Sequence, residues 1–152
     1  MSFNSLSFDE LDEQVIQKLV FDEEEMSPIL KGHIFIERIL ETLISNNLSN
    51  PKAFFKRTWS FDLKVDLALA TGLIDGKYFS AFKAINKVRN NYAHKHEYKV
   101  VFEDLSSFKF EWEATQNEAF NGACTKGSVE AARIATIFLC WKAIHLIKQP
   151  IV

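Results

Sequence analysis

One stretch of sequence decides the fold of this 152-residue chain: residues 27–47, which read SPILKGHIFIERILETLISNN. Pro28 suits the first position of a helix, where a backbone N–H is not needed. Apolar residues then recur at helical spacing, at Ile29, Leu30, Ile34, Ile36, Leu40, Leu43 and Ile44. The stretch therefore predicts an amphipathic helix that ends around Asn46 and Asn47.

A helix is also predicted before this stretch. Ser7 and Glu10 have the spacing of a capping box, in which two side chains satisfy backbone N–H groups at a helix start. This helix should run to about Phe21. Its expected inward-facing residues are Leu11, Val15, Leu19 and Val20.

Three more helices are predicted after residues 27–47, at residues 60–70, 77–92 and 128–148. The last is apolar on nearly every face, so it should be buried on several sides. Residues 98–126 fit a short strand, a short helix or a packed loop, and the sequence leaves that choice open. A total of five helices, give or take one, predicts an all-α chain that forms a single helical bundle over residues 1–152.

Composition narrows the classes of function. The formal net charge is −2, which argues against a protein that coats duplex DNA with a basic face. No signal peptide is visible, and the most apolar stretch, residues 134–147, is shorter than the ~20 residues of a membrane span. We therefore expect a cytoplasmic protein that neither enters a membrane nor binds duplex DNA directly.

Cysteine and histidine usage predicts neither a disulfide nor a metal centre. Cys124 and Cys140 form no Cys-x-x-Cys pair, and no Cys/His cluster has zinc spacing. We expect two free, buried thiols and neither metal nor cofactor.

Fourteen phenylalanines indicate a thick aromatic core or a surface that binds a partner. Together with the apolar last helix, they predict a homodimer with helix 77–92 near its axis.

Polar side chains on inward helix faces are the first candidates for function. Arg89 shares a stripe with Ile85 and Tyr92, and a guanidinium on a core face is costly unless it is paired or used. His33 and Glu37 are four residues apart and share one helix face. Either these groups are structural, or Glu37 reaches across and orients Arg89. We predict a salt bridge between Glu37 and Arg89 within one chain.

A further polar group lies at the end of helix 77–92. His94 follows Arg89 by five residues, which places the two side chains about 140° apart on an ideal helix. They converge only if the helix unwinds near Ala93 or the long arginine wraps around it. Asn90, four residues before His94, is placed to hold the imidazole by a hydrogen bond. We expect the helix to fray just after Ala93, so that Arg89 and His94 face one polar cleft lined by Asn90.

This segment resembles the Arg-x4–6-His signature of HEPN domains (higher eukaryotes and prokaryotes nucleotide-binding). It reads Arg89-Asn90-Asn91-Tyr92-Ala93-His94, with the polar residue that often follows the arginine in that superfamily. His94 fits a four-residue spacer and His96 a six-residue spacer.

Several blocks, in order, look like the bacterial mannitol-operon repressor family and related small proteins. The blocks are residues 32–40, 61–64, 67–74 and 85–90. The similarity covers roughly residues 29–96. It implies a helical bundle, usually dimeric, with the Arg-His segment near the dimer cleft. Active HEPN proteins are metal-independent ribonucleases that act as toxins, antiviral effectors or RNA-processing enzymes, whereas the mannitol-repressor-like branch is described as regulatory.

Two functions of different classes follow. In a ribonuclease, His94 would act as the base or on the leaving oxygen, Arg89 would hold the phosphate and Asn90 would orient His94. Supporting residues would be Glu37, His33, His96 and Tyr92. In a non-enzymatic regulatory or protein-interaction module, Arg89, Glu37 and His94 would instead form a buried polar network that fixes helix register.

The partner expected from the sequence differs between these functions. A ribonuclease would bind RNA, and as a toxin it would have a cognate antitoxin. A module for transcription regulation would bind a regulatory protein, because no helix-turn-helix with a basic recognition helix is visible. A helical antitoxin or immunity protein is a third reading, for which the sequence offers no feature of its own.

Overall fold

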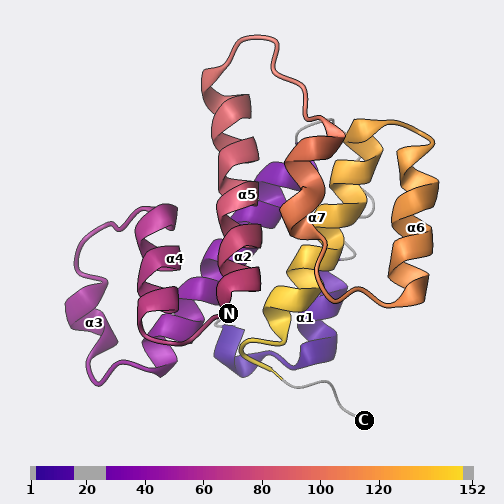
Figure 1. Cartoon of the computed structure of the whole chain (residues 1–152). Helices are drawn as coiled ribbons and strands as arrows, with labels where there is room; N and C mark the ends of the chain where they lie inside the picture. The colour runs from indigo at the N-terminus through magenta and orange to yellow at the C-terminus, as the bar shows by residue number, and fades with distance from the viewer. Residues whose placement is uncertain (1–2, 16–26, 149–152) are drawn as a thin grey trace.

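A computed structural model describes residues 3–15 and 27–148. Within these ranges the regular structure is entirely helical, which confirms the predicted helical bundle (Figure 1). The α-helices are α1 (Phe8–Val15), α2 (Ser27–Asn46), α3 (Pro51–Phe54), α4 (Phe61–Ala70), α5 (Gly76–His94), α6 (Ala114–Cys124) and α7 (Ser128–Ile144). Two 3₁₀ helices are η1 (Phe3–Ser5) and η3 (Phe102–Phe108).

The predicted helices are present, and the described residues contain more helices than the five expected. Helices α2, α4, α5 and α7 lie close to their predicted ranges. Helix α1 is described to Val15, so the predicted continuation to Phe21, with Leu19 and Val20, lies outside the described residues. The additional elements are α6, η3, η1 and the single turn α3. Within residues 98–126, which the sequence left open, residues 102–108 and 114–124 are helical.

Three of these helices begin with a capping side chain. The Ser7 hydroxyl accepts from the Glu10 N–H at 3.2 Å, and the Ser60 hydroxyl accepts from the Leu63 N–H at 3.1 Å. The Asp75 carboxylate accepts from the Lys77 and Tyr78 N–H groups in the first turn of α5, at 3.0 and 3.1 Å. Each bond satisfies a donor that has no partner inside its helix.

Helix α2 is central to the bundle. It packs against α4 and α5 on one side and against α7 on the other (Figure 1). Helix α7 is buried on several faces, as predicted, from Ala131 through Ile144. At the α2–α7 crossing, a Cβ on Gly32 would overlap the methyl group of the buried Thr136 side chain, so only glycine permits this approach.

One residue of the predicted α2 stripe faces the wrong way. Ile34 is 57% exposed, whereas Ile29, Ile36 and Leu40 are buried. The reason is angular: Ile34 follows Ile29 by five residues, which places it about 140° around the helix from the buried stripe. Its inclusion in that stripe is therefore wrong.

The two cysteines are not joined by a disulfide bond. Cys124 and Cys140 are free, with Cys140 buried and Cys124 half-buried. Burial raises the pKa of the Cys140 thiol. Among the described helices, none combines the length and apolar character needed to cross a membrane.

Candidate functional site

Polar side chains from α2, α4 and α5 meet in one junction. The His33 Nε2 atom lies 2.9 Å from the Asn86 side-chain oxygen, and the Asn86 amide nitrogen donates to Asp62 at 3.2 Å. Because a carboxylate only accepts, Asn86 turns its NH₂ group to Asp62 and its oxygen to His33. His33 therefore carries its proton on Nε2. The ring also stacks on Phe61, with centroids 4.1 Å apart.

Burial favours the neutral form of this histidine. His33 is 7% exposed, and burial lowers the pKa of its imidazole. The Asn86 bond and the negative charge of Glu37 act in the opposite direction, whereas the charges of Arg89 and Lys64 add to the lowering. A buried, stacked and hydrogen-bonded imidazole fixes the junction and is poorly placed to exchange protons with a substrate.

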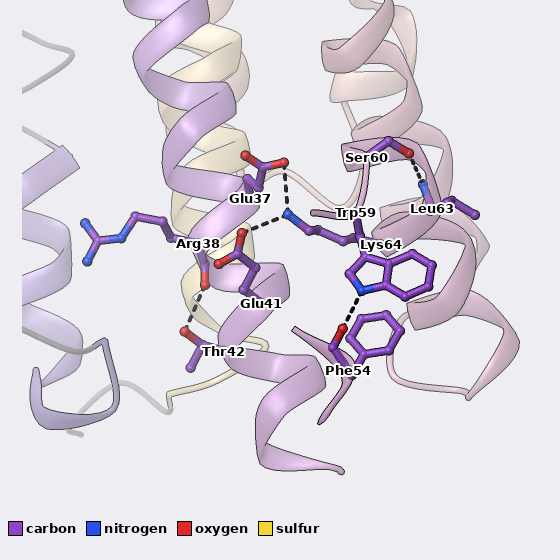
Figure 2. A network of polar contacts seen from close by, with 9 residues as sticks. All are labelled: Glu37, Arg38, Glu41, Thr42, Phe54, Trp59, Ser60, Leu63 and Lys64. Atoms are coloured by element: carbon purple, nitrogen blue, oxygen red, sulfur yellow. Dashed lines mark hydrogen bonds and ion pairs between the residues drawn. The ribbon is translucent and has the colours of Figure 1, made fainter. Parts of the chain in front are cut away.

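The predicted salt bridge between Glu37 and Arg89 is wrong. Glu37 pairs with Lys64 of α4 at 3.3 Å, and Lys64 also pairs with Glu41 at 2.8 Å (Figure 2). Lys64 is 6% exposed and needs carboxylates around its ammonium group, so it takes Glu37 as a partner. None of the ion pairs found in the described ranges includes Arg89.

Arg89 has a different neighbour. Its Nη1 donates to the Asn90 side-chain oxygen at 3.1 Å, and both residues are half-buried. An asparagine oxygen fixes a guanidinium without cancelling its charge. The structure thus presents a positioned cation whose charge lies beside His33 at the edge of the junction.

His94 lies at the last position of α5, where the helix persists one residue longer than expected. The predicted unwinding near Ala93 is absent, because helical structure continues through His94 and Lys95 forms the C-cap. His94 is exposed, and no described hydrogen bond joins it to Asn90 or Arg89. The prediction that Arg89 and His94 converge within one chain required the helix to unwind, and the helix does not unwind.

The chain after α5 folds back onto its last turns. The Val100 N–H donates to the Tyr92 hydroxyl at 3.3 Å, and the Tyr92 and Tyr98 rings meet edge to face. The Tyr98 hydroxyl donates to Asp104 at 2.6 Å. Burial raises the pKa of Tyr98 to about 12, and the Asp104 bond adds to the shift. Tyr92 thus supports the end of α5 by packing.

Exposed basic residues surround that end. Lys87, His94, Lys95, His96 and Lys99 are all exposed. His96 is almost fully solvated and lies 3.8 Å from the neighbouring carboxylate of Glu97.

A polar groove lies beside the middle of α5. The groove, of about 670 Å³, lies between α5 and η3 and is lined by Lys83, Lys87, Ser106 and Ser107 among others. Lys83 and Lys87 share their helix stripe with Asn90 and His94, by the i, i+4, i+7, i+11 spacing. Asp62 and Asp66 hold the Lys83 ammonium group at 3.0 and 2.9 Å.

Three residues of the junction were absent from the sequence-based candidates: Asn86, Asp62 and Lys64. For Lys64 a signal existed, since it shares a helical stripe with the buried Phe61, Val65 and Ala68. Asp62 and Asn86 lie within blocks 61–64 and 85–90, and the resemblance of these blocks to the mannitol-operon repressor family was the only sequence signal for them.

Comparison with known proteins identifies no relative: no family model matches the chain, and no curated protein or solved structure is significantly similar.

No group of three or more His, Cys, Asp or Glu side chains within residues 3–15 and 27–148 is arranged to hold a metal ion.

Proposed function

We propose that this chain is a metal-independent, HEPN-type endoribonuclease whose active site forms at the C-terminal end of α5 in a homodimer. The observation that carries the proposal is Arg89: a half-buried guanidinium held by Asn90, without a carboxylate partner among the described ion pairs. A positioned cation with its charge uncancelled is suited to hold a phosphate through two of its N–H groups.

The proposed reaction is cleavage by the 2′-hydroxyl of the substrate RNA. His94 of one copy removes the proton from that hydroxyl, and the 2′ oxygen attacks the adjacent phosphorus. Arg89 stabilises the charge that develops on the phosphate oxygens. The bond from phosphorus to the 5′ oxygen breaks, and His94 of the second copy returns a proton to that oxygen. The products are a 2′,3′-cyclic phosphate and a 5′-hydroxyl.

The dimer is needed because of the helix geometry. A continuous α5 places Arg89 and His94 about 140° apart, so one copy alone presents them in different directions. Two copies of α5 near a two-fold axis bring Arg89 of one towards His94 of the other. In this arrangement Asn90 positions Arg89, and Lys87 lies on the stripe of His94, where it can contact a neighbouring phosphate.

The test is a cleavage assay on mixed RNA in the presence of EDTA. Wild-type protein should cleave, and His94→Ala and Arg89→Ala should each abolish cleavage while leaving the dimer intact in sedimentation. The matched control is His145→Ala, an exposed histidine near the end of α7, at the opposite end of the bundle (Figure 1). A wild-type protein without activity, or a His94→Ala protein with full activity, contradicts the proposal. If His96→Ala loses activity and His94→Ala does not, the base is His96, which fits the six-residue spacer.

A second candidate is a non-enzymatic regulatory or protein-interaction module. The observation that favours it is the junction of His33, Asn86 and Asp62, where hydrogen bonds among the buried His33, the half-buried Asn86 and the exposed Asp62 join α2, α4 and α5. Such a network specifies one packing arrangement and needs no substrate. In that case the wild type should cleave no RNA, and Arg89→Ala should weaken binding to a regulatory protein partner.

A further inference from the structure

A second hollow lies at the other end of the bundle. A pocket of about 420 Å³ opens between α1, the start of α6 and the end of α7. Its walls include the rings of Phe8, Phe138 and Trp141, and Phe138 and Trp141 lie 5.2 Å apart between centroids. The ring of His145 meets Phe8 edge to face at 5.0 Å. The volume falls within the range of small-molecule sites, and aromatic walls of this kind are typical of them.

The charged groups of this pocket are of one sign. The carboxylates of Asp12 and Glu113 line it, and none of its described lining residues is lysine or arginine. Neither carboxylate takes part in an ion pair found in residues 3–15 and 27–148. A third carboxylate, Asp9, acts on Asp12 from one turn away. The pocket is thus electrostatically complementary to a cation.

Asp12 shows the cost of this arrangement. Burial raises the pKa of its carboxyl, and the negative charge of Asp9 raises it further, while the Trp141 indole N–H beside it acts in the opposite direction. A bound cation would relieve both unfavourable effects. The aromatic faces add to the attraction, because a ring quadrupole is negative over its face.

Hydrogen-bond acceptors in the pocket favour a cation that carries N–H groups. The His145 Nδ1 atom lies 2.8 Å from the Trp141 carbonyl oxygen, which only accepts, so the proton of a neutral ring is on Nδ1 and Nε2 is an acceptor. With the carboxylates of Asp12 and Glu113, three side chains can accept from an ammonium group.

We propose that this pocket binds a small alkylammonium compound, with its carbon chain against the Phe8, Phe138 and Trp141 rings and its ammonium group on Asp12 and Glu113. This site is separate from the end of α5 and does not depend on the ribonuclease proposal. Because recognition requires ionised carboxylates, affinity should fall as the pH drops and Asp12 takes up its proton.

The test is calorimetric titration of the intact protein with 1,4-diaminobutane, using 1,4-butanediol as the uncharged analogue. The diamine should bind and the diol should not. Asp12→Asn should weaken binding by at least about tenfold, since it removes one close charge interaction. Trp141→Leu should also weaken it, through loss of the ring face. The matched control is Glu118→Gln, which removes the same charge from an exposed position of α6 outside the pocket.

Three results would overturn the site. They are no binding of the diamine at millimolar concentration, equal binding of the diol, or unchanged diamine affinity in Asp12→Asn. If Trp141→Leu does not fold, Asp12→Asn combined with Glu113→Gln decides the matter, because both changes keep the volume of the side chains. Unchanged affinity in that double variant also excludes the site.

Discussion

Removing the two carboxylates around Lys64 is expected to destabilise the fold far more than removing the lysine. Lys64 is 6% exposed, whereas the side chains of Glu37 and Glu41 are 30% and 43% exposed. In the double variant Glu37→Gln, Glu41→Gln, the ammonium group stays buried without a countercharge, which costs about 3–5 kcal/mol. In Lys64→Met the glutamates regain water and the methionine stays packed, so we expect a loss of at most about 1 kcal/mol.

Urea-induced unfolding followed by circular dichroism measures these free energies. The control is the triple variant Glu37→Gln, Glu41→Gln, Lys64→Met, which lacks all three charges and should recover most of the stability that the double variant loses. The reasoning is refuted if the double variant unfolds within about 1 kcal/mol of wild type. It is also refuted if the triple variant is no more stable than the double variant.

Three further predictions concern stability and reactivity. Gly32→Ala should cost about 1–3 kcal/mol in urea unfolding, and Thr136→Ser, which removes the overlapping methyl group, should recover part of it. Since the pKa of His33 is lowered in the folded protein, the unfolded chain binds more protons, and stability should fall as pH drops below about 6.5. His33→Gln should lack this loss, and an equal loss would contradict the assignment. In native protein, an aromatic disulfide reagent should modify Cys124 and spare the buried Cys140 until urea is added, so a native Cys124→Ser protein should release no chromophore.

Helices with strong local signals could be predicted from the sequence. Ser60 is a capping residue that predicts the start of α4, and the apolar repeat of residues 27–47 predicts α2. Helix α6 lacks such a repeat, because Phe120 and Ala123 are its only buried side chains. The helix packs against α7. Its one signal, Gln116 three residues after Glu113, is a capping pattern that means little without an apolar stripe.

Three residues near the candidate site could be predicted from the sequence, but their pairing could not. Periodicity placed His33, Glu37 and Arg89 on inward faces, and these three residues do lie near one another. Which cation takes Glu37 depends on how closely α4 approaches α2, and that distance follows from packing rather than from either helix alone. The local sequence also could not show that α5 remains helical through His94.

The position of α7 in the chain affects how the protein is made. Helices α1 and α2 both pack against α7, which follows them by a long stretch of sequence. On a ribosome, the roughly 100 residues from Ser27 to Gly127 take about 5–20 s to synthesise. During that interval the apolar face of α2 that later meets α7 has no native partner. The nascent chain therefore exposes a hydrophobic helix face that a chaperone can bind, and release has to wait until α7 emerges from the exit tunnel.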